Sequence, residues 1–229
     1  GATLDITPVN DAPAGTDKTV VTPENTAYTL TVTDFGFSDP ADTPAHGLSE
    51  VKITTLPGAG TLAVSGVAVQ AGAFVSAADI DSGKLKFTPS ANESGTGYAT
   101  FTFQVRDDGG TANGGVDLDA SPNTIAIDVT QVNRAPKVFD LSYSIIEDTG
   151  LDDGLLTAID DDGDGLIISL LDGAAHGTAV VDEAGNYSYV PEANFNGTDS
   201  FTYWAFDGAL YSNVGTVTIR VTEVNDAPA

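Results

Sequence analysis

The residues best placed to do chemistry in this sequence are carboxylates that crowd into short stretches. The densest stretch spans six residues and carries four acids, Asp160, Asp161, Asp162 and Asp164. Carboxylates this close repel one another strongly unless a cation or water screens them. A hard cation with oxygen ligands suits such a cluster, and Ca²⁺ tolerates an irregular oxygen shell better than Mg²⁺. We therefore expect a calcium site here, with a solvated acidic turn as the alternative.

The same stretch begins like an EF-hand loop, in which aspartates alternate along the first positions. The bidentate glutamate that closes an EF-hand loop would fall at the twelfth position, which is Leu171 in this sequence. An EF-hand is therefore not expected, and any calcium site must draw its other ligands from elsewhere in the chain.

The acid excess of the whole chain excludes several classes of partner. Thirty-three acidic residues oppose eight basic ones, which gives a formal net charge of -25 at pH 7. Nucleic acid and anionic membranes are poor partners for such a surface. No apolar run approaches the roughly 20 residues that span a bilayer, so direct membrane insertion is not expected. A soluble or salt-adapted surface would account for the charge without any cation.

Nucleophilic catalysis finds little support in the sequence. The chain has no cysteine, which excludes disulfides and thiol chemistry and is compatible with an extracellular location. Its two histidines, His46 and His176, each precede a glycine and lack the serine and aspartate pattern of a catalytic triad. Paired carboxylates could hydrolyse glycosides, but the acids recur in repeated segments, which make a poor active site. We therefore expect no enzyme.

A repeated strand sets the frame in which these acids must lie. Residues 3–13, 125–136 and 217–228 each form an alternating strand pattern that ends in Val-Asn-Xaa-Ala-Pro. Proline after the strand removes a backbone donor and ends the ladder. Modules that close on the same strand indicate a tandem array.

The repeats predict the domain organisation. Residues 1–11 are interpreted as the closing strand and linker of a preceding repeat, 12–133 as repeat 1, 134–226 as repeat 2, and 227–229 as the start of the next linker. Repeat 1 is the longer, with loop insertions expected near residues 40–48, 70–81 and 109–122 and a helical turn at 75–80.

Alternating strands predict β-sandwiches with one buried face per strand. Phe101, Phe103 and Val105 should point into the core of repeat 1, as should the corresponding side chains of repeat 2, Phe201, Tyr203 and Ala205. Trp204 falls on the opposite, solvent-side face. It is a candidate contact for a sugar or a protein, unless a neighbouring loop covers it.

Several motifs resemble a known family. They are Glu-Asp-Thr at 147–149, Asp-Xaa-Asp-Gly-Asp at 160–164, Asn-Phe-Asn-Gly-Thr-Asp-Ser-Phe-Thr-Tyr at 194–203, Phe-Asp-Gly at 206–208 and Val-Asn-Asp-Ala-Pro at 224–228. Together they resemble the bacterial cadherin-like repeats of giant RTX-type surface adhesins. The resemblance covers residues 10–229. It is more specific in repeat 2, because repeat 1 carries loop insertions.

The resemblance implies an all-β fold of two tandem Greek-key cadherin/Ig-like β-sandwiches in a head-to-tail array. It implies Ca²⁺ at the interdomain junctions and a role in cell adhesion or biofilm, as extender or adhesive repeats of a protein secreted to the bacterial cell surface. Expected partners are neighbouring repeats of the same chain and host or cell-surface glycan or protein, with the fragment itself a monomer. A ligand-binding module for carbohydrate or protein, and a non-catalytic appendage of a secreted enzyme, are the alternatives.

The resemblance also implies calcium ligands at three junctions. The N-terminal junction would use Asn10, Asp11, Asp39, Asp42 and Asp107. The central junction would use Glu24, Asn133, Asp160, Asp162, Asp164 and Asp207. The C-terminal junction would use Glu147, Asn225 and Asp226.

The central linker differs from the last one at two positions. Gln131 and Arg134 stand where the last linker has Glu223 and Asp226. The central junction thereby loses two carboxylates and gains a cation, so we expect fewer or weaker calcium ions there. An alternative is that Arg134 pairs with a neighbouring acid and replaces one ion.

Overall fold

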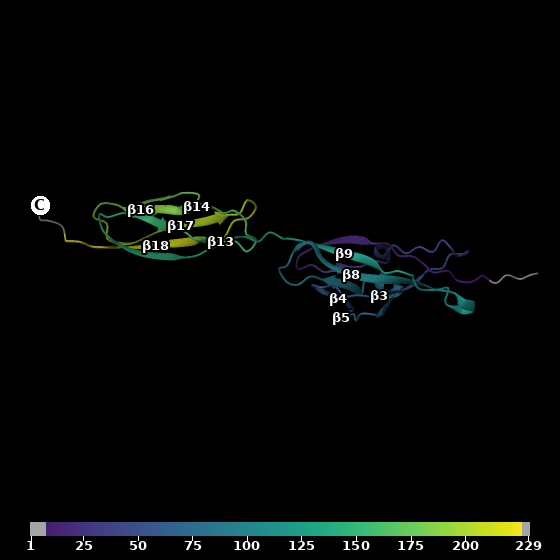
Figure 1. The fold of residues 1–229 in the computed structure, drawn as a ribbon. Coiled ribbons are helices and arrows are strands. Elements are labelled where there is room, and N and C mark those ends of the chain that lie inside the picture. The colour runs from purple at the N-terminus through teal and green to yellow at the C-terminus, as the bar shows by residue number, and fades with distance from the viewer. Residues whose placement is uncertain (1–7, 226–229) are drawn as a thin grey trace, which may run out of the picture. The chain divides into compact units, whose positions relative to one another are not determined.

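The chain divides into two compact units, at the boundary between Val132 and Asn133. The computed structural model describes residues 8–225. Within that range, unit 1 comprises residues 8–132 and unit 2 comprises residues 133–225. Residues 3–7 of the first copy of the repeated strand and the predicted ligand Asp226 lie outside the described residues. Figure 1 shows that each unit is a strand-rich sandwich.

Unit 1 is a β-sandwich with three short helical turns. Its strands are β1 (Lys18–Pro23), β2 (Tyr28–Thr29), β3 (Leu48–Ile53), β4 (Thr61–Val64), β5 (Val67–Ala68), β6 (Phe74–Ser76), β7 (Leu85–Thr88), β8 (Gly95–Asp107) and β9 (Asn123–Thr130). Its helical turns are η1 (Val32–Phe35), α1 (Ala77–Asp81) and η2 (Ala112–Gly114). One sheet has the order β1-β9-β8-β3-β6 and the other the order β2-β7-β4-β5.

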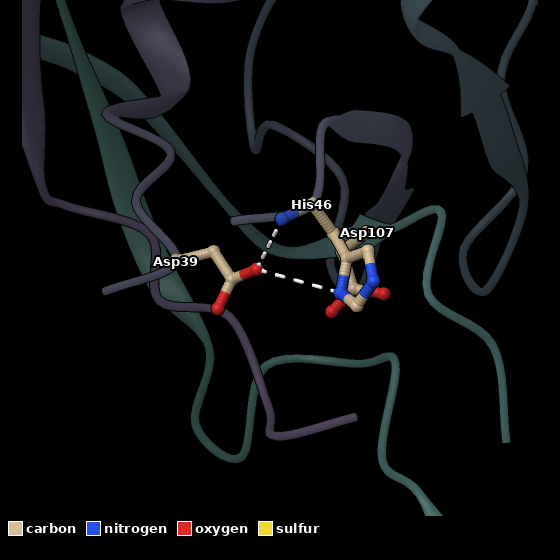
Figure 2. A group of neighbouring side chains, drawn as sticks. All are labelled: Asp39, His46 and Asp107. Atoms are coloured by element: carbon tan, nitrogen blue, oxygen red, sulfur yellow. Dashed lines mark hydrogen bonds and ion pairs between the residues drawn. The ribbon is translucent and has the colours of Figure 1, made fainter. Parts of the chain in front are cut away.

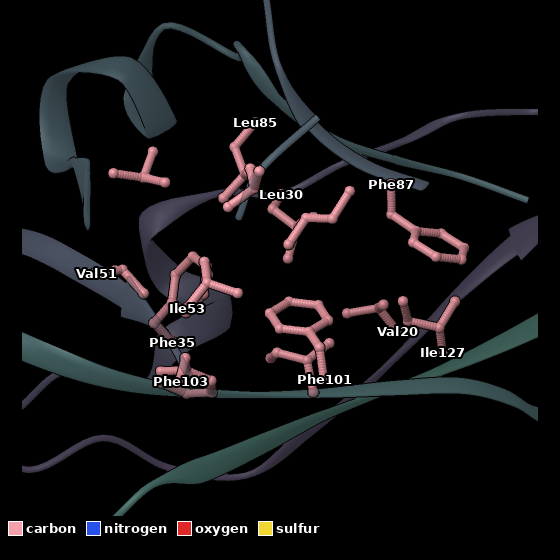
Figure 3. Close-up of a cluster of buried hydrophobic side chains, with 14 of the residues drawn as sticks. Val20, Leu30, Phe35, Val51, Ile53, Leu85, Phe87, Phe101, Phe103 and Ile127 are labelled. Carbon is pink, nitrogen blue, oxygen red and sulfur yellow. The ribbon is translucent and has the colours of Figure 1, made fainter. Parts of the chain in front are cut away.

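The core of unit 1 fills the space between these two sheets. Phe101, Phe103 and Val105 are fully buried, which confirms the inward face predicted for β8. Phe35 from η1 packs edge-on against Phe103, with ring centroids 4.9 Å apart. Figure 3 shows how side chains from both sheets converge on these rings. The predicted helical turn at 75–80 is α1, whereas residues 74–76 form strand β6 rather than the expected loop.

Unit 2 is also built from β-strands, and its described residues, 133–225, form no helical turn. Its strands are β10 (Lys137–Val138), β11 (Leu141–Ile146), β12 (Leu151–Leu155), β13 (Ala158–Ile159), β14 (Ile167–Asp172), β15 (Gly177–Val181), β16 (Asn186–Pro191), β17 (Gly197–Phe206) and β18 (Gly215–Thr222). One sheet has the order β11-β18-β17-β14, a second the order β12-β16-β15, and β10 pairs with β13.

Tyrosines dominate the core of unit 2. Phe201, Tyr203 and Ala205 are buried, as are Val217, Ile219 and Val221 of β18, so both predicted inward faces are confirmed. Tyr189 lies so close to Gly177 that a Cβ on this glycine would fall 2.5 Å from the tyrosine ring.

The strands of both units confirm the predicted all-β class with two tandem sandwiches. Among residues 8–225, the helical turns lack the length and apolar character of a membrane-spanning helix.

Both units pair their first long strand in parallel with their last. β1 runs beside β9 from Lys18↔Ile125 to Pro23↔Thr130, and β11 runs beside β18 from Leu141↔Val217 to Ile146↔Thr222. The residue after each first strand therefore lies beside the start of the linker that follows the last strand. These residues are Glu24 and Glu147.

Asp199 is a buried acid that organises one edge of unit 2. Its carboxylate accepts hydrogen bonds from the amides of Ala175 (3.0 Å), His176 (2.9 Å) and Ser200 (2.9 Å) and from the Tyr189 hydroxyl (2.9 Å). Burial alone would raise the pKa of Asp199, but these four donors outweigh it and hold the pKa below its ordinary value.

We expect Asp199→Asn to make the free energy of unfolding of unit 2 depend less steeply on pH in the acidic range. Because the folded pKa lies below the unfolded value of about 3.9, the stability that Asp199 contributes is present above about pH 4 and is lost as the pH falls through the folded pKa. The variant should lose roughly 1 to 2 kcal/mol at pH 7 and converge with the wild type at low pH. Urea unfolding between pH 2.5 and 7 measures this, and parallel pH profiles would contradict it.

Candidate metal centres

The first candidate centre lies at the N-terminal end of unit 1. The Asn10 side-chain amide donates to both Asp107 carboxylate oxygens, at 3.1 and 3.3 Å, and to the Val116 carbonyl at 2.8 Å. Asp107 is the last residue of β8, and its Oδ1 also accepts from the Gly109 amide at 2.9 Å. Both Asn10 and Asp107 are buried. These bonds tie the segment that precedes the unit to the end of its longest strand.

The loop between η1 and β3 brings further ligands to this centre. Asp39 Oδ2 accepts from the His46 amide at 2.8 Å, and Asp42 Oδ2 accepts from the Asp11 amide at 3.0 Å. One ligand atom from each of Asp39, His46 and Asp107 lies within 4.8 Å of the others. Figure 2 shows the His46 imidazole beside the carboxylates of Asp39 and Asp107.

Several polar atoms at the first centre have no hydrogen-bond partner among the described residues. Asp39 Oδ1 and Asn10 Oδ1 are both buried and unpartnered, and the Asp39 side chain is 0 % exposed. A buried carboxylate oxygen without a partner costs several kcal/mol of folding free energy unless a cation compensates it. The residues present therefore fit a bound divalent cation, which would accept these two oxygens as ligands.

The second candidate centre repeats this arrangement at the start of unit 2. The Asn133 amide donates to Asp207 Oδ2 at 3.0 Å, and the Arg134 backbone amide donates to Asp162 Oδ2 at 2.5 Å. Asp160 Oδ1 accepts from the amides of Asp162 (2.8 Å) and Asp164 (3.3 Å), while Asp160 Oδ2 is buried and unpartnered within residues 8–225. The linker asparagine, the aspartate after the long strand and the acidic loop thus meet in both units.

Asp207 is held ready for a cation by the turn that follows β17. Its Oδ1 accepts from the amides of Leu210 (2.6 Å) and Ala209 (2.7 Å). The Leu210 amide foremost, with the Ala209 amide and the Asn133 side chain, lowers the pKa of Asp207 below its ordinary value. Asp207 therefore stays ionised at neutral pH and below it.

Arg134 distinguishes the second centre from the first. Its guanidinium donates to Asp162 Oδ1 at 2.6 Å, and the Asp162 side chain is only 1 % exposed. The pairing of Arg134 with a neighbouring acid is thus present in the structure. The first centre has Asp11 at the corresponding position, so one centre receives a built-in positive charge and the other an extra negative one.

Glu24 and Glu147 lie at the other end of their units, where the first and last strands both end. Glu24 Oε1 accepts from the Val132 amide at 3.1 Å, and Glu147 Oε1 accepts from the Val224 amide at 2.6 Å. Both glutamates are buried, at 2 % and 5 % exposed. Each is fixed against the linker residue that immediately precedes a predicted asparagine ligand, Asn133 or Asn225.

The structure gathers most of the predicted ligands into these two centres. Those of the first are Asn10, Asp11, Asp39, Asp42 and Asp107, and those of the second are Asn133, Asp160, Asp162, Asp164 and Asp207. Asn225 is exposed at the end of the described chain. His46, which lies in the first group of potential ligands, was not predicted. Its only sequence signal is a position seven residues after Asp39 in an acidic loop.

The aromatic face of β17 is partly covered. Trp204 stacks on Tyr211 with ring centroids 4.4 Å apart, and Phe206 contacts the same ring at 4.6 Å. Tyr211 is 54 % exposed and comes from the loop after β17. A role for Trp204 in binding sugar or protein stays a prediction.

Comparisons with known proteins agree with this architecture. Residues 133–223 match the family model of the bacterial cadherin-like domain, and residues 10–119 match that of the bacterial Ig domain. Both matches are consistent with the predicted resemblance to bacterial cadherin-like repeats, and neither indicates an enzyme family. No curated protein matches the chain.

Among solved structures, human mucin-like protocadherin EC1-2 is 16 % identical, with 93 % of this chain and 98 % of that chain covered and a TM-score of 0.51. Protocadherin gammaB7 EC3-6, solved as a cis-dimer, is 14 % identical, with 92 % and 51 % covered and a TM-score of 0.56. Protocadherin gamma B2 domains 3-6 are 15 % identical, with 94 % and 52 % covered and a TM-score of 0.54. The chain thus spans about half the length of the two gamma protocadherin structures, and these identities show a shared fold alone. The chain is therefore a tandem of two β-sandwich units, the first matching the family model of the bacterial Ig domain over residues 10–119 and the second that of the bacterial cadherin-like domain over residues 133–223.

Proposed function

We propose that the two units are calcium-binding extender and adhesive repeats of a bacterial cell-surface adhesin, stiffened by Ca²⁺ at the junctions between successive repeats. Cadherin-like and Ig-like bacterial domains are adhesion-type repeats, which supports the general role. The partners proposed are the neighbouring repeats of the same chain and a glycan or protein on the surface to which the adhesin binds.

The observation that carries the proposal is a set of hydrogen bonds, the acidic frame, that recurs at the start of both units. It joins a linker asparagine, the aspartate at the end of the long strand and an acidic loop. Asn10 donates to Asp107, the last residue of the long strand β8, and Asn133 donates to Asp207, the residue after the long strand β17. The residue after each asparagine then donates its backbone amide to an acidic loop. The two units differ in sequence, yet each gathers carboxylates around the asparagine that precedes it.

Oxygen donors dominate both frames, which favours Ca²⁺. Ca²⁺ takes six to eight oxygen ligands from carboxylates, amide carbonyls and water. The unpartnered oxygens of Asn10, Asp39 and Asp160 are donors of this class. When bound, Ca²⁺ would supply positive charge that holds linker and loops together, and no other chemistry is required of it.

Stiffening follows from where the ligands sit along the chain. Glu24 is fixed against Val132, and the next residue, Asn133, belongs to the frame of unit 2. A cation that draws ligands from a linker and from the body of a repeat stabilises only those conformations in which the two are close. Without the cation, the carboxylates repel one another and the linker is released.

Small-angle X-ray scattering tests the proposal. In CaCl₂ the two-unit chain should give a longer maximum dimension and a narrower distribution of shapes than in EGTA at equal ionic strength. Asp207→Asn should reduce this difference, because it weakens the contact of the second centre with Asn133. Asp153→Asn, an exposed acid on β12 outside both centres, is the matched control. Superposable scattering curves in calcium and in EGTA would rule the proposal out.

A further inference from the structure

We propose that the centre at the start of unit 1 is a mixed nitrogen and oxygen site for a borderline divalent cation such as Zn²⁺, with His46 Nδ1 as a ligand beside Asp39 and Asp107. This inference rests on the proposed function in that it uses the same acidic frame. It goes beyond it by assigning the first centre a different cation preference from the second.

The first support is the state of the His46 imidazole. His46 Nδ1 is buried and has no hydrogen-bond partner among the described residues. It lies 3.7 Å from Asp39 Oδ2 and 3.6 Å from Asp42 Oδ2, beyond hydrogen-bond distance of either. The backbone amide of His46 donates to Asp39 at 2.8 Å, which anchors the loop beneath the ring. The imidazole nitrogen thus lies within ion-pair distance, but not hydrogen-bond distance, of two carboxylates, a spacing that suits a cation shared among them.

The second support is the convergence of unpartnered atoms on one spot. A Cβ placed on Gly109 would fall 1.9 Å from Asn10 Oδ1 and 2.4 Å from His46 Nδ1, so both atoms face the space above this glycine. Neither atom has a hydrogen-bond partner among the described residues. A cavity of about 160 Å³ opens at this place, lined in part by Asn10, Asp42, His46 and Gly109. It has room for an ion and several waters, since a water occupies about 30 Å³.

The third support is donor chemistry. Imidazole nitrogen suits Zn²⁺, Cu²⁺, Fe²⁺ and Ni²⁺, whereas Ca²⁺ takes oxygen ligands. In the described part of unit 2 the corresponding group consists of Asp160, Asp162 and Asp164 and offers oxygens alone. Ligands bound tetrahedrally to Zn²⁺ at about 2.0 Å lie roughly 3.3 Å apart. The separation of 3.7 Å between His46 Nδ1 and Asp39 Oδ2 therefore needs to contract by only a few tenths of an ångström, and the ligand atoms of Asp39, His46 and Asp107 all lie within 4.8 Å of one another.

Calorimetric titration of the full chain, stripped of metal, tests the inference with ZnCl₂ and CaCl₂ as separate probes. We expect wild-type protein to bind Zn²⁺ and His46→Ala to bind it at least tenfold more weakly, with Ca²⁺ affinity changed less than twofold. His176→Ala is the matched control, because His176 also precedes a glycine but stacks on Phe195 in unit 2. It should bind Zn²⁺ as the wild type does.

X-ray absorption at the zinc edge of the wild-type chain provides a second readout that needs no variant. It should show one imidazole among oxygen ligands. Equal Zn²⁺ affinity in His46→Ala and wild type, or an oxygen-only zinc shell, would overturn the inference. Ca²⁺ binding without Zn²⁺ binding would overturn the inference and leave the proposed function standing. Binding of neither ion would overturn both.

Discussion

Saturating Ca²⁺ should raise the melting temperature of each unit by roughly 10 °C over its value in EGTA. A ligand at a hundredfold excess over its dissociation constant adds about 2.7 kcal/mol to the folded state. For a domain of around 100 residues, each kcal/mol shifts the melting temperature by roughly 4 °C. The unpartnered oxygens of Asp39 and Asp160 are where this energy is gained, because the cation replaces solvent that burial has removed from them.

Differential scanning calorimetry measures this shift, and the fluorescence of the chain's single tryptophan separates the two units. Trp204 lies in unit 2, so its signal follows that unit alone. Asp160→Asn should reduce the calcium shift of the fluorescence transition, and Asp39→Asn should leave that transition unchanged while reducing the shift of unit 1.

Screening of the net charge of -25 needs its own control, because salt alone stabilises so acidic a chain. NaCl at matched ionic strength should reproduce only a small part of the shift. A shift of the same size in NaCl, or in Asp39→Asn and Asp160→Asn together, would mean that Ca²⁺ acts by screening and not by binding at the two centres.

The sequence was sufficient for the long strands, because they follow from local pattern, whereas the calcium ligands were implied by the resemblance to cadherin-like repeats and stay a prediction. Alternation in β8 and β17 is read directly from Phe101, Phe103, Phe201 and Tyr203, whose burial depends only on the period of the strand. The linker asparagines are equally plain, since a repeated motif marks them. Their partners Asp107 and Asp207 were implied by the resemblance, which places a ligating aspartate after the long sixth strand.

Contacts made by irregular loops were harder to predict. The loop that carries Asp39 and His46 has no periodicity to show which side chains turn inward, so nothing in the sequence indicated that the His46 imidazole lies among the carboxylates. The cover that Tyr211 gives Trp204 depends in the same way on how the loop after β17 folds back. By contrast, the pairing of Arg134 could be anticipated, because an arginine in a linker near so many acids has carboxylates to pair with.

Replacing Arg134 by alanine should destabilise unit 2 by about 3 kcal/mol in EGTA, and Ca²⁺ should restore most of the loss. The substitution removes the guanidinium from an Asp162 carboxylate that is 1 % exposed, and breaking a buried ion pair costs about 3 to 5 kcal/mol. The lower end applies because the Arg134 side chain is 30 % exposed. In calcium, a second ion can take the place that the guanidinium occupied.

Urea unfolding followed by Trp204 fluorescence, in EGTA and in CaCl₂, measures both parts of this prediction. Arg220→Ala is the matched control, since Arg220 is an exposed arginine on β18 of the same unit and should show little loss in either condition. An equal loss for Arg134→Ala with and without calcium would show that the guanidinium supports the fold but does not stand in for an ion.

Arg134→Asp replaces the cation by a carboxylate and gives the central linker the Val-Asn-Asp sequence of the other two linkers. The carboxylate would join Asp160, Asp162 and Asp207 where the guanidinium now lies. Calorimetric titration should then count one more Ca²⁺ per chain than in the wild type. If the stoichiometry stays the same, the wild-type centre already binds its full complement of ions, and Arg134 is an addition to that centre rather than a substitute for one of its cations.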